Sequence, residues 1–356
     1  MESEKSVAIE EACRFCWMCR HLCPVALVTG NEANTPRGRA LVMSMDRRNF
    51  PYGKSSAEKM FQCCLCYACT DDCATGYDPT VFTREARSRA LSEGLAEPKV
   101  KKLAASLLKG NNPLIHEKAD TGYTALTDKL PEKADVLIYR SGYTKSVVPF
   151  LSLLARSHIE YTTAKDEPVS GTLACDVAGY VEEAADLARK WASWMNKSGA
   201  KTVVCFNPGD VYFAREQMAK WDISIVPEIM TATAFTARMA KSGKIVFQNH
   251  TGKITYHDPS RMARNLEETE EPRMLLTNAG WQLNELFLHG HLARSAGSIV
   301  LQNLYPEIEE KVGQAFWEDA VRSGIKEIVT ASPETLACLV KTAPHGMKAV
   351  DIFSML

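Results

Sequence analysis

The chain carries the segment CRFCWMCRHLC at residues 13–23 and repeats its cysteine spacing as CCLCYACTDDC at residues 63–73. Both segments read C-x-x-C-x-x-C-x-x-x-C. Two-residue gaps let a tight loop bring three thiolates to one cluster, and the longer last gap sends the fourth thiolate to a neighbouring cluster. The two segments therefore predict a pair of linked metal centres, and the fold of the first third of the chain has to be built around them.

This spacing resembles that of bacterial-type ferredoxins, in which three cysteines of a run ligate one four-iron cluster and the fourth ligates its neighbour. The resemblance implies two [4Fe-4S] clusters. Cys13, Cys16, Cys19 and Cys73 would hold cluster 1, and Cys63, Cys66, Cys69 and Cys23 would hold cluster 2. Zinc is the main alternative, but zinc sites usually pair C-x-x-C units and use four ligands in all. Eight cysteines in two identical runs fit that pattern poorly.

The composition is that of a globular protein, and it limits the kinds of partner. The 356 residues are 46% hydrophobic and 24% charged, with a formal net charge of −1. A length of this size suggests about two to three domains. The near-zero charge gives no sign of nucleic acid or of anionic lipid. The polar start MESEK argues against a secretory signal, and no apolar run reaches the roughly 18 residues of a membrane span. We expect a cytoplasmic protein, and association with a membrane through a partner stays open.

About forty residues separate the two cysteine runs, and they read as helical. Thr35 followed by Pro36 is a good start for a helix. This insert resembles the α-helical ferredoxin domain of the succinate dehydrogenase iron–sulfur subunit and of heterodisulfide reductase electron-transfer subunits, in which Pro-Arg-Gly-Arg follows the first run, as at 36–39 here. That family expects a proline after Cys73, where this chain has Ala74. Helical periodicity over 82–95 and a basic helix over 98–110 would close the domain.

Bases and aromatic residues are concentrated beside the expected ligands. Cations near an anionic cluster raise its reduction potential, although the same bases could be ordinary solvated charges or contacts to a partner. The bases are Arg14, Arg20, His21, Arg37 and Arg39. Phe15, Trp17 and Tyr67 are expected to shield the clusters from water. The cysteines outside the spacing (Cys64, Cys175, Cys205 and Cys338) are expected to be packed thiols.

The remainder of the chain contains a hidden duplication. Short apolar runs recur as 134–139, 200–208 and 223–227 in one half, and as 252–257, 325–333 and 348–352 in the other. The second run of each half follows Ser-Gly and ends at a proline. Helical stretches such as 181–196 and 307–322 lie between these runs. Strands that alternate with helices indicate parallel α/β units.

This arrangement resembles the duplicated cysteine-rich (CCG) domain of heterodisulfide reductase and of the glycolate oxidase iron–sulfur subunit. In the first half, Val169 and Ser170 stand before Gly171 where that family has two cysteines, and Asn207 stands before a proline where it has one. In the second half, Ser260 follows Pro259 and Ser332 precedes a proline at positions where the family has cysteine. The stretch 294–297 corresponds to the second CCG motif. Iron–sulfur clusters require soft thiolates. We therefore expect no cluster and no heterodisulfide reduction in residues 130–356. His257 and Asp258 could form an acid/base pair, but a turn-forming remnant of the motif is the favoured interpretation.

The predicted fold is α + α/β. An N-terminal α-helical ferredoxin domain precedes two repeated CCG-like α/β halves with short parallel strands. The expected boundaries are 1–110 for the cluster-binding domain, 111–133 for a linker, 134–245 for the first half and 246–356 for the second half.

The leading hypothesis is an iron–sulfur electron-transfer subunit of a cytoplasmic multisubunit oxidoreductase, without catalytic residues of its own. Single electrons would pass through two [4Fe-4S] clusters between a flavoprotein partner and another redox carrier. The resemblance implies that this partner is a FAD-linked dehydrogenase, an electron-transferring flavoprotein or a heterodisulfide-reductase-like flavin subunit, in a hetero-oligomer. The alternatives are an oxidoreductase with its own small-substrate or quinone site in the α/β part, and a zinc-binding assembly module.

Overall fold

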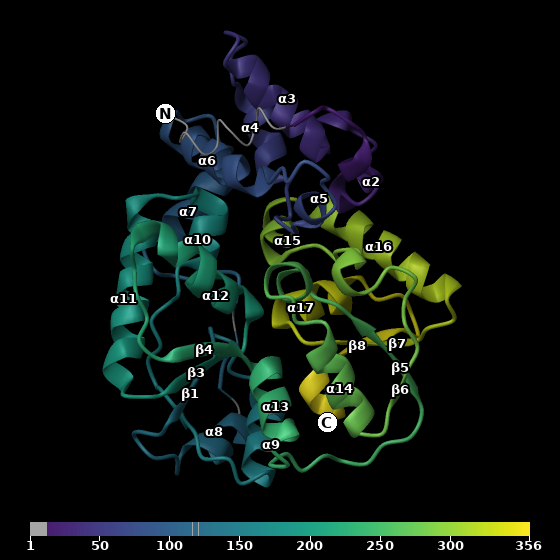
Figure 1. Ribbon diagram of the computed structural model, residues 1–356. Helices are drawn as coiled ribbons and strands as arrows, with labels where there is room; N and C mark the ends of the chain where they lie inside the picture. Colours follow the sequence, from purple (N-terminus) through teal and green to yellow (C-terminus); the bar gives the residue numbers. More distant parts are fainter. Residues whose placement is uncertain (1–12, 116, 120) are drawn as a thin grey trace.

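The structure, a computed structural model, describes residues 13–115, 117–119 and 121–356. A helical N-terminal part lies at the top of Figure 1, and two α/β halves lie side by side beneath it. The expected α + α/β class is therefore confirmed. Among the described residues, no helix combines the length and the apolar character that crossing a bilayer requires.

Short helices make up the N-terminal part. They are η1 (Met18–Arg20), α2 (Pro24–Thr29), η2 (Glu32–Asn34), α3 (Pro36–Asp46), α4 (Lys54–Phe61), α5 (Ala68–Asp71), α6 (Pro79–Ser92) and α7 (Pro98–Leu108). Helix α3 begins where the sequence predicts, because the hydroxyl of Thr35 accepts a hydrogen bond from the Gly38 amide at 2.8 Å. Helix α6 begins three residues before the expected range, because Asp78 accepts a bond from the Thr80 amide at 2.9 Å and caps it.

Gly38 lies where α3 passes closest to η2. A Cβ at this position would be 2.1 Å from the carbonyl oxygen of Glu32. We expect Gly38→Ala to lower the free energy of unfolding by about 2 kcal/mol, because the backbone of η2 has to move to admit a methyl group. Urea denaturation under anaerobic conditions measures the change. Gly53→Ala is the control, since a Cβ there meets nothing within 4 Å, and equal losses in the two variants would contradict the steric explanation.

The first α/β half contains a four-stranded parallel sheet in the order β2-β1-β3-β4. Its elements are α8 (Thr121–Thr127), β1 (Val136–Tyr139), α9 (Val148–Arg156), β2 (Thr162–Thr163), α10 (Thr172–Ala178), α11 (Glu182–Ser198), β3 (Thr202–Cys205), α12 (Pro208–Tyr212), η3 (Phe213–Gln217), η4 (Met218–Trp221), β4 (Glu228–Thr231) and α13 (Ala232–Lys241).

The second half repeats this order as β6-β5-β7-β8, again all parallel. Its elements are β5 (Lys253–His257), η5 (Arg261–Asn265), α14 (Glu270–Asn278), β6 (Gln282–Leu283), η6 (Gly290–Leu292), α15 (Ile299–Leu304), α16 (Pro306–Arg322), β7 (Glu327–Thr330), α17 (Pro333–Thr342), β8 (Lys348–Asp351) and η7 (Ile352–Met355). A π-helical segment follows β3 and α12 in the first half (η3), and another follows β5 in the second half (η5).

Two details of the strands differ from the sequence prediction. The third strand of the first half was expected at 223–227, but β4 covers Glu228–Thr231. Pro227 has no amide hydrogen to give to a ladder, so pairing begins with the Glu228 amide, which donates to the Lys201 carbonyl at 2.9 Å. The edge strands β2 and β6 were not predicted, because two paired residues are too short to leave a periodic pattern.

Hydrophobic cores join the three parts. One core contains Ile138 and Phe150 of the first half together with Val329 and Phe353 of the second, and the rings of Phe150 and Phe353 lie 4.7 Å apart. Another core contains residues of α3 and α6 together with residues of α10, α15 and α16. The helical N-terminal part is thus packed against both α/β halves.

Candidate iron–sulfur site

Four of the expected ligands come together around one small cavity. Cys63, Cys66 and Cys69 belong to the loop and short helix that follow α4, and Cys23 is the residue that precedes α2. All four line this cavity, with Cys64 beside them. Burial raises the pKa of Cys23 to about 11, and the neighbouring Cys66 and Cys63 add to the shift.

The other four cysteines form a second, more exposed group. Burial raises the pKa of Cys13, and so do the charges of its neighbours Cys16 and Cys73. Burial also raises the pKa of Cys19 to about 11, with contributions from Cys13 and Cys16. The structure thus places Cys73 with the first run and Cys23 with the second. Crossed ligation requires this grouping, and the ligation itself remains a prediction.

The two runs repeat one local backbone geometry. The amide of Phe15 donates to the sulfur of Cys13, and the amide of Leu65 donates to the sulfur of Cys63, each at 3.4 Å. Phe15 and Leu65 reach these positions with φ values of 51° and 49°. A left-handed backbone is costly for such residues and is found mainly at functional sites. Amide hydrogen bonds to a ligating sulfur raise the reduction potential of the cluster.

The five bases near the runs differ in their surroundings. Arg39 is buried and donates through Nε to the Lys59 carbonyl at 3.0 Å. Burial alone would lower its pKa, but the thiolates of Cys63 and Cys23 raise it. Arg37 donates to the Phe15 carbonyl at 3.0 Å. The remaining three bases, Arg14, Arg20 and His21, are exposed.

The three aromatic residues that were expected to shield the clusters differ in exposure. Tyr67 is buried, whereas Phe15 and Trp17 are 38% and 56% exposed. The guanidinium of Arg37 lies 3.8 Å from the centre of the Trp17 ring, and that of Arg20 lies 5.0 Å from it. The first run therefore presents an aromatic ring in contact with two arginines at the protein surface.

The sequence analysis missed the arginines that fasten the second run to its surroundings. Arg87 of α6 donates to the Cys63 carbonyl at 2.7 Å, and Arg264 of η5 donates to the Cys66 carbonyl at 3.0 Å. Arg84 of α6 pairs with Asp176 at 2.8 Å. A signal was present, because Arg84 and Arg87 lie three residues apart on the face of α6 that also carries buried apolar residues.

Residues at the replaced cysteine positions also converge. Ser260, Ser295 and Ser332 line one cleft with Asn207, and the same cleft is lined by Cys63, Cys64 and Cys66. Within the described ranges, no three His, Cys, Asp or Glu side chains gather tightly enough for a single metal ion, and this holds for the cysteine groups too. A four-iron cluster is larger than one ion and takes its thiolates at its corners.

His257 and Asp258 are both engaged in the fold. The Nε2 atom of His257 lies 3.0 Å from the Arg294 carbonyl oxygen, and burial lowers the pKa of the ring. Asp258 pairs with Arg273 at 2.7 Å. These contacts agree with the interpretation of the pair as a structural remnant of the motif.

Comparison with known proteins supports an iron–sulfur assignment. Residues 12–78 match the family of 4Fe-4S dicluster domains. The chain is 23% identical to one subunit of the dihydromethanophenazine:CoB–CoM heterodisulfide reductase of Methanosarcina barkeri, over 91% of this chain and 86% of that subunit. The corresponding subunit of Methanosarcina mazei is 21% identical, over 75% of this chain and 72% of its own length. A probable membrane-anchored ferredoxin of Chromohalobacter salexigens is 22% identical, over 68% of this chain and 38% of that protein.

The chain is thus an iron–sulfur protein that is similar to this heterodisulfide reductase subunit along most of its length. The dicluster match lies on the two cysteine runs, and the longer similarity extends into both α/β halves.

Proposed function

We propose that this iron–sulfur protein, similar to a subunit of heterodisulfide reductase, is an electron-transfer subunit that passes single electrons through two [4Fe-4S] clusters. Cys13, Cys16, Cys19 and Cys73 would hold cluster 1, and Cys63, Cys66, Cys69 and Cys23 would hold cluster 2. The observation that carries the proposal is the grouping of the cysteines into these two neighbouring sets. Each cluster, when bound, supplies a centre that accepts and releases one electron.

The two sets of cysteines differ in exposure, and this difference indicates which set would exchange electrons with a partner. Cluster 2 would lie inside the protein, because its loop is held by Arg87 of α6 and by Arg264 of the second α/β half. Cluster 1 would lie near the surface, because Cys16 is exposed and Trp17 beside it is 56% exposed. Electron tunnelling between proteins requires a short distance, so the exposed set is the place where a partner would exchange electrons.

The chemistry of this exposed face indicates the kind of partner. Phe15, Trp17 and Met18 are exposed large side chains, and Arg37 and Arg20 lie against the Trp17 ring. Aromatic residues and arginine are enriched where proteins bind one another. A partner with an acidic rim would be attracted by Arg14 and Arg20, whereas Arg37 is already paired with Glu32. We propose a flavoprotein subunit in a hetero-oligomeric complex, as the resemblance implies.

The decisive experiment measures cofactor and electron transfer on the full chain purified without oxygen. We expect about eight irons and about eight sulfides per chain, as two four-iron clusters require. After reduction, EPR should show two interacting clusters, and stopped-flow mixing with the copurified flavoprotein should reoxidise them. Trp17→Ala should slow this reoxidation while the iron content stays unchanged.

Two results would contradict the proposal. Zinc without sulfide would remove the redox function altogether. The second result is turnover of a substrate by the isolated chain without any flavoprotein, with iron and sulfide in the expected amounts. It would identify an enzyme with its own site in the α/β part.

A further inference from the structure

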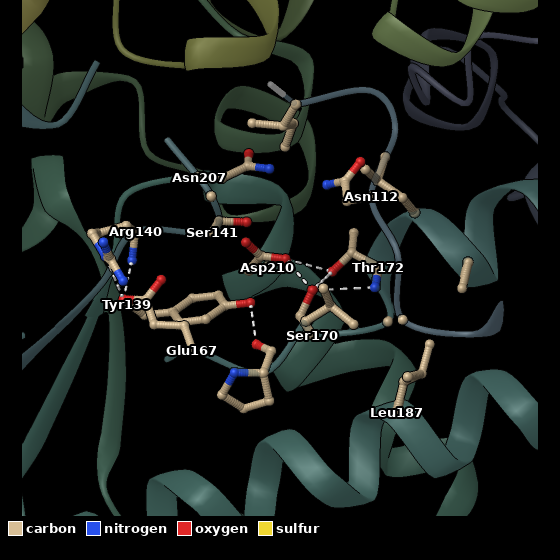
Figure 2. Close-up of a pocket in the computed structure, with 18 of the residues that line it drawn as sticks. Asn112, Tyr139, Arg140, Ser141, Glu167, Ser170, Thr172, Leu187, Asn207 and Asp210 are labelled. Atoms are coloured by element: carbon tan, nitrogen blue, oxygen red, sulfur yellow. Dashed lines mark hydrogen bonds and ion pairs between the residues drawn. The ribbon is translucent and has the colours of Figure 1, made fainter. Parts of the chain in front are cut away.

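A cavity of about 360 Å³ lies in the first α/β half, away from the cysteine runs. Figure 2 shows it beyond the carboxyl ends of the strands, where Arg140 and Ser141 follow β1 and Asn207 and Asp210 follow β3. Ligands of parallel α/β sheets bind at this edge, and small-molecule pockets have volumes in this range. The site is therefore in the right place and of the right size for a small ligand.

The carboxylate of Asp210 is the unusual group in this cavity. Its side chain is 1% exposed. Oδ1 accepts hydrogen bonds from the hydroxyls of Ser170 at 2.5 Å and Thr172 at 2.7 Å. Oδ2 is buried and makes no hydrogen bond of ordinary geometry within the described part of the chain, although the hydroxyl of Ser141 lies near the carboxylate and lowers its pKa. A buried carboxylate oxygen without a donor is costly, so this oxygen is ready to accept a bond from a ligand.

Among the wall residues that the structure describes, no cation pairs with this carboxylate. Arg140 pairs instead with Glu167 at 3.1 Å and donates to the Ala164 carbonyl at 2.7 Å. Lys165 and Asp166 stand exposed at the mouth with opposite charges. Burial raises the pKa of Asp210, and Arg261 opposes this shift only from a distance, since its guanidinium is bound to Asp176 at 2.6 Å.

Apolar side chains line another part of the cavity, beside Asn111 and Asn112. The apolar residues of this part are Leu107 of α7, Ile115 after α7, Val169 before α10 and Leu187 of α11. A ligand that fills the cavity therefore meets a carboxylate and hydroxyls at one end and hydrocarbon at the other. Ser141 lies beside the carboxylate in Figure 2 and has a φ of 59°, a strained backbone of the kind that functional sites retain.

We propose that this cavity binds a small organic amine, whose ammonium group donates to Oδ2 of Asp210 and whose hydrocarbon part lies against Leu107 and Leu187. The ammonium supplies a well-aligned hydrogen-bond donor for Oδ2 and a positive charge beside the buried carboxylate. The inference does not rest on the electron-transfer function, because it concerns a cavity on another part of the chain.

Isothermal titration calorimetry on the full, cluster-loaded chain tests the proposal with three probes of equal length: n-pentylamine, 1-pentanol and pentanoate. We expect saturable binding of the amine at least about tenfold tighter than that of the alcohol, since a charge-assisted bond exceeds a neutral one by this order. Pentanoate should not bind. Asp210→Asn should weaken amine binding at least about tenfold. Asp128→Asn is the matched control, because it removes the same charge from an exposed residue outside the cavity, and it should leave amine binding unchanged.

The amide oxygen that Asp210→Asn introduces can still accept from Ser170 and Thr172, which favours an intact fold, and circular dichroism checks it. The comparison of amine with alcohol uses the native chain and does not depend on any variant. The proposal is overturned if the amine shows no saturable binding, if amine and alcohol bind equally, or if Asp210→Asn binds the amine as the native chain does. Calorimetry records no electron transfer, so failure here leaves the iron and EPR results standing on their own.

Discussion

Replacing Cys73 with serine is expected to alter the cluster that is held by the first run, although Cys73 belongs to the second. Its neighbour in the structure is Cys13 of the first run. Serine is a poor ligand for iron compared with a thiolate. Cluster 1 should be lost or reduced to a three-iron form, and cluster 2 should keep its four irons.

EPR of the reduced protein, with iron analysis, measures this outcome. The spectrum of Cys73→Ser should match that of Cys13→Ser and differ from that of Cys66→Ser. The reciprocal variant Cys23→Ser should match Cys66→Ser. Iron should fall from about eight per chain to between about four and about seven, depending on whether the damaged cluster is lost or keeps three irons.

Cys64→Ser is the matched control. Cys64 lies beside a ligand and lines the same small cavity, but it has no place in the repeated spacing. We expect this variant to retain about eight irons, the number required for two intact clusters. If Cys73→Ser disturbed the same EPR signal as Cys66→Ser, each run would hold its own cluster and the crossed assignment would be wrong.

The features that sequence reasoning recovered are those carried by local signals. The start of α3 follows from the Thr35–Pro36 pair, and the internal duplication follows from short apolar runs that recur in the same order. The strand β4 was misplaced because the apolar residues before Pro227 look like a strand, while proline delays the ladder to Glu228.

What the sequence could not supply is the pairing between distant segments. Arg264 reaches the Cys66 carbonyl across 198 positions of the chain. Asp210 of α12 accepts hydrogen bonds from Ser170 and Thr172 at the start of α10. These contacts depend on how the second run and the two α/β halves pack together, and no local pattern records that packing. A charged residue on an apolar helix face, such as Arg84, is the closest sequence signal.

The buried ion pairs around Asp176 are expected to contribute strongly to the stability of the fold. Asp176 of α10 pairs with Arg84 at 2.8 Å and with Arg261 at 2.6 Å, so one carboxylate joins α6, the first half and the second half. Arg84 is 1% exposed. Asp176→Asn would leave two guanidinium groups without their shared counter-charge. Removing one partner of a buried pair costs about 3–5 kcal/mol, and we expect the free energy of unfolding to fall by about this amount.

Urea denaturation at pH 7, followed by circular dichroism without oxygen, measures this loss. Asp186→Asn is the matched control on the next helix, because Asp186 pairs with Arg189 at 2.7 Å but is exposed. An exposed pair contributes at most about 1 kcal/mol. Equal losses in the two variants would contradict the role assigned to Asp176.

The dependence on pH separates an ionic role of Asp176 from a packing role. Burial alone would raise the pKa of Asp176, but Arg261 and Arg84 hold it below its ordinary value. A carboxyl whose pKa is depressed by folding stabilises the protein above its unfolded pKa of about 4, and this contribution disappears as the pH falls through the folded pKa. The difference in stability between the native chain and Asp176→Asn should therefore be constant from about pH 5 to 8 and shrink below about pH 4. A difference that persists undiminished in acid would show that the side chain acts through its shape rather than its charge.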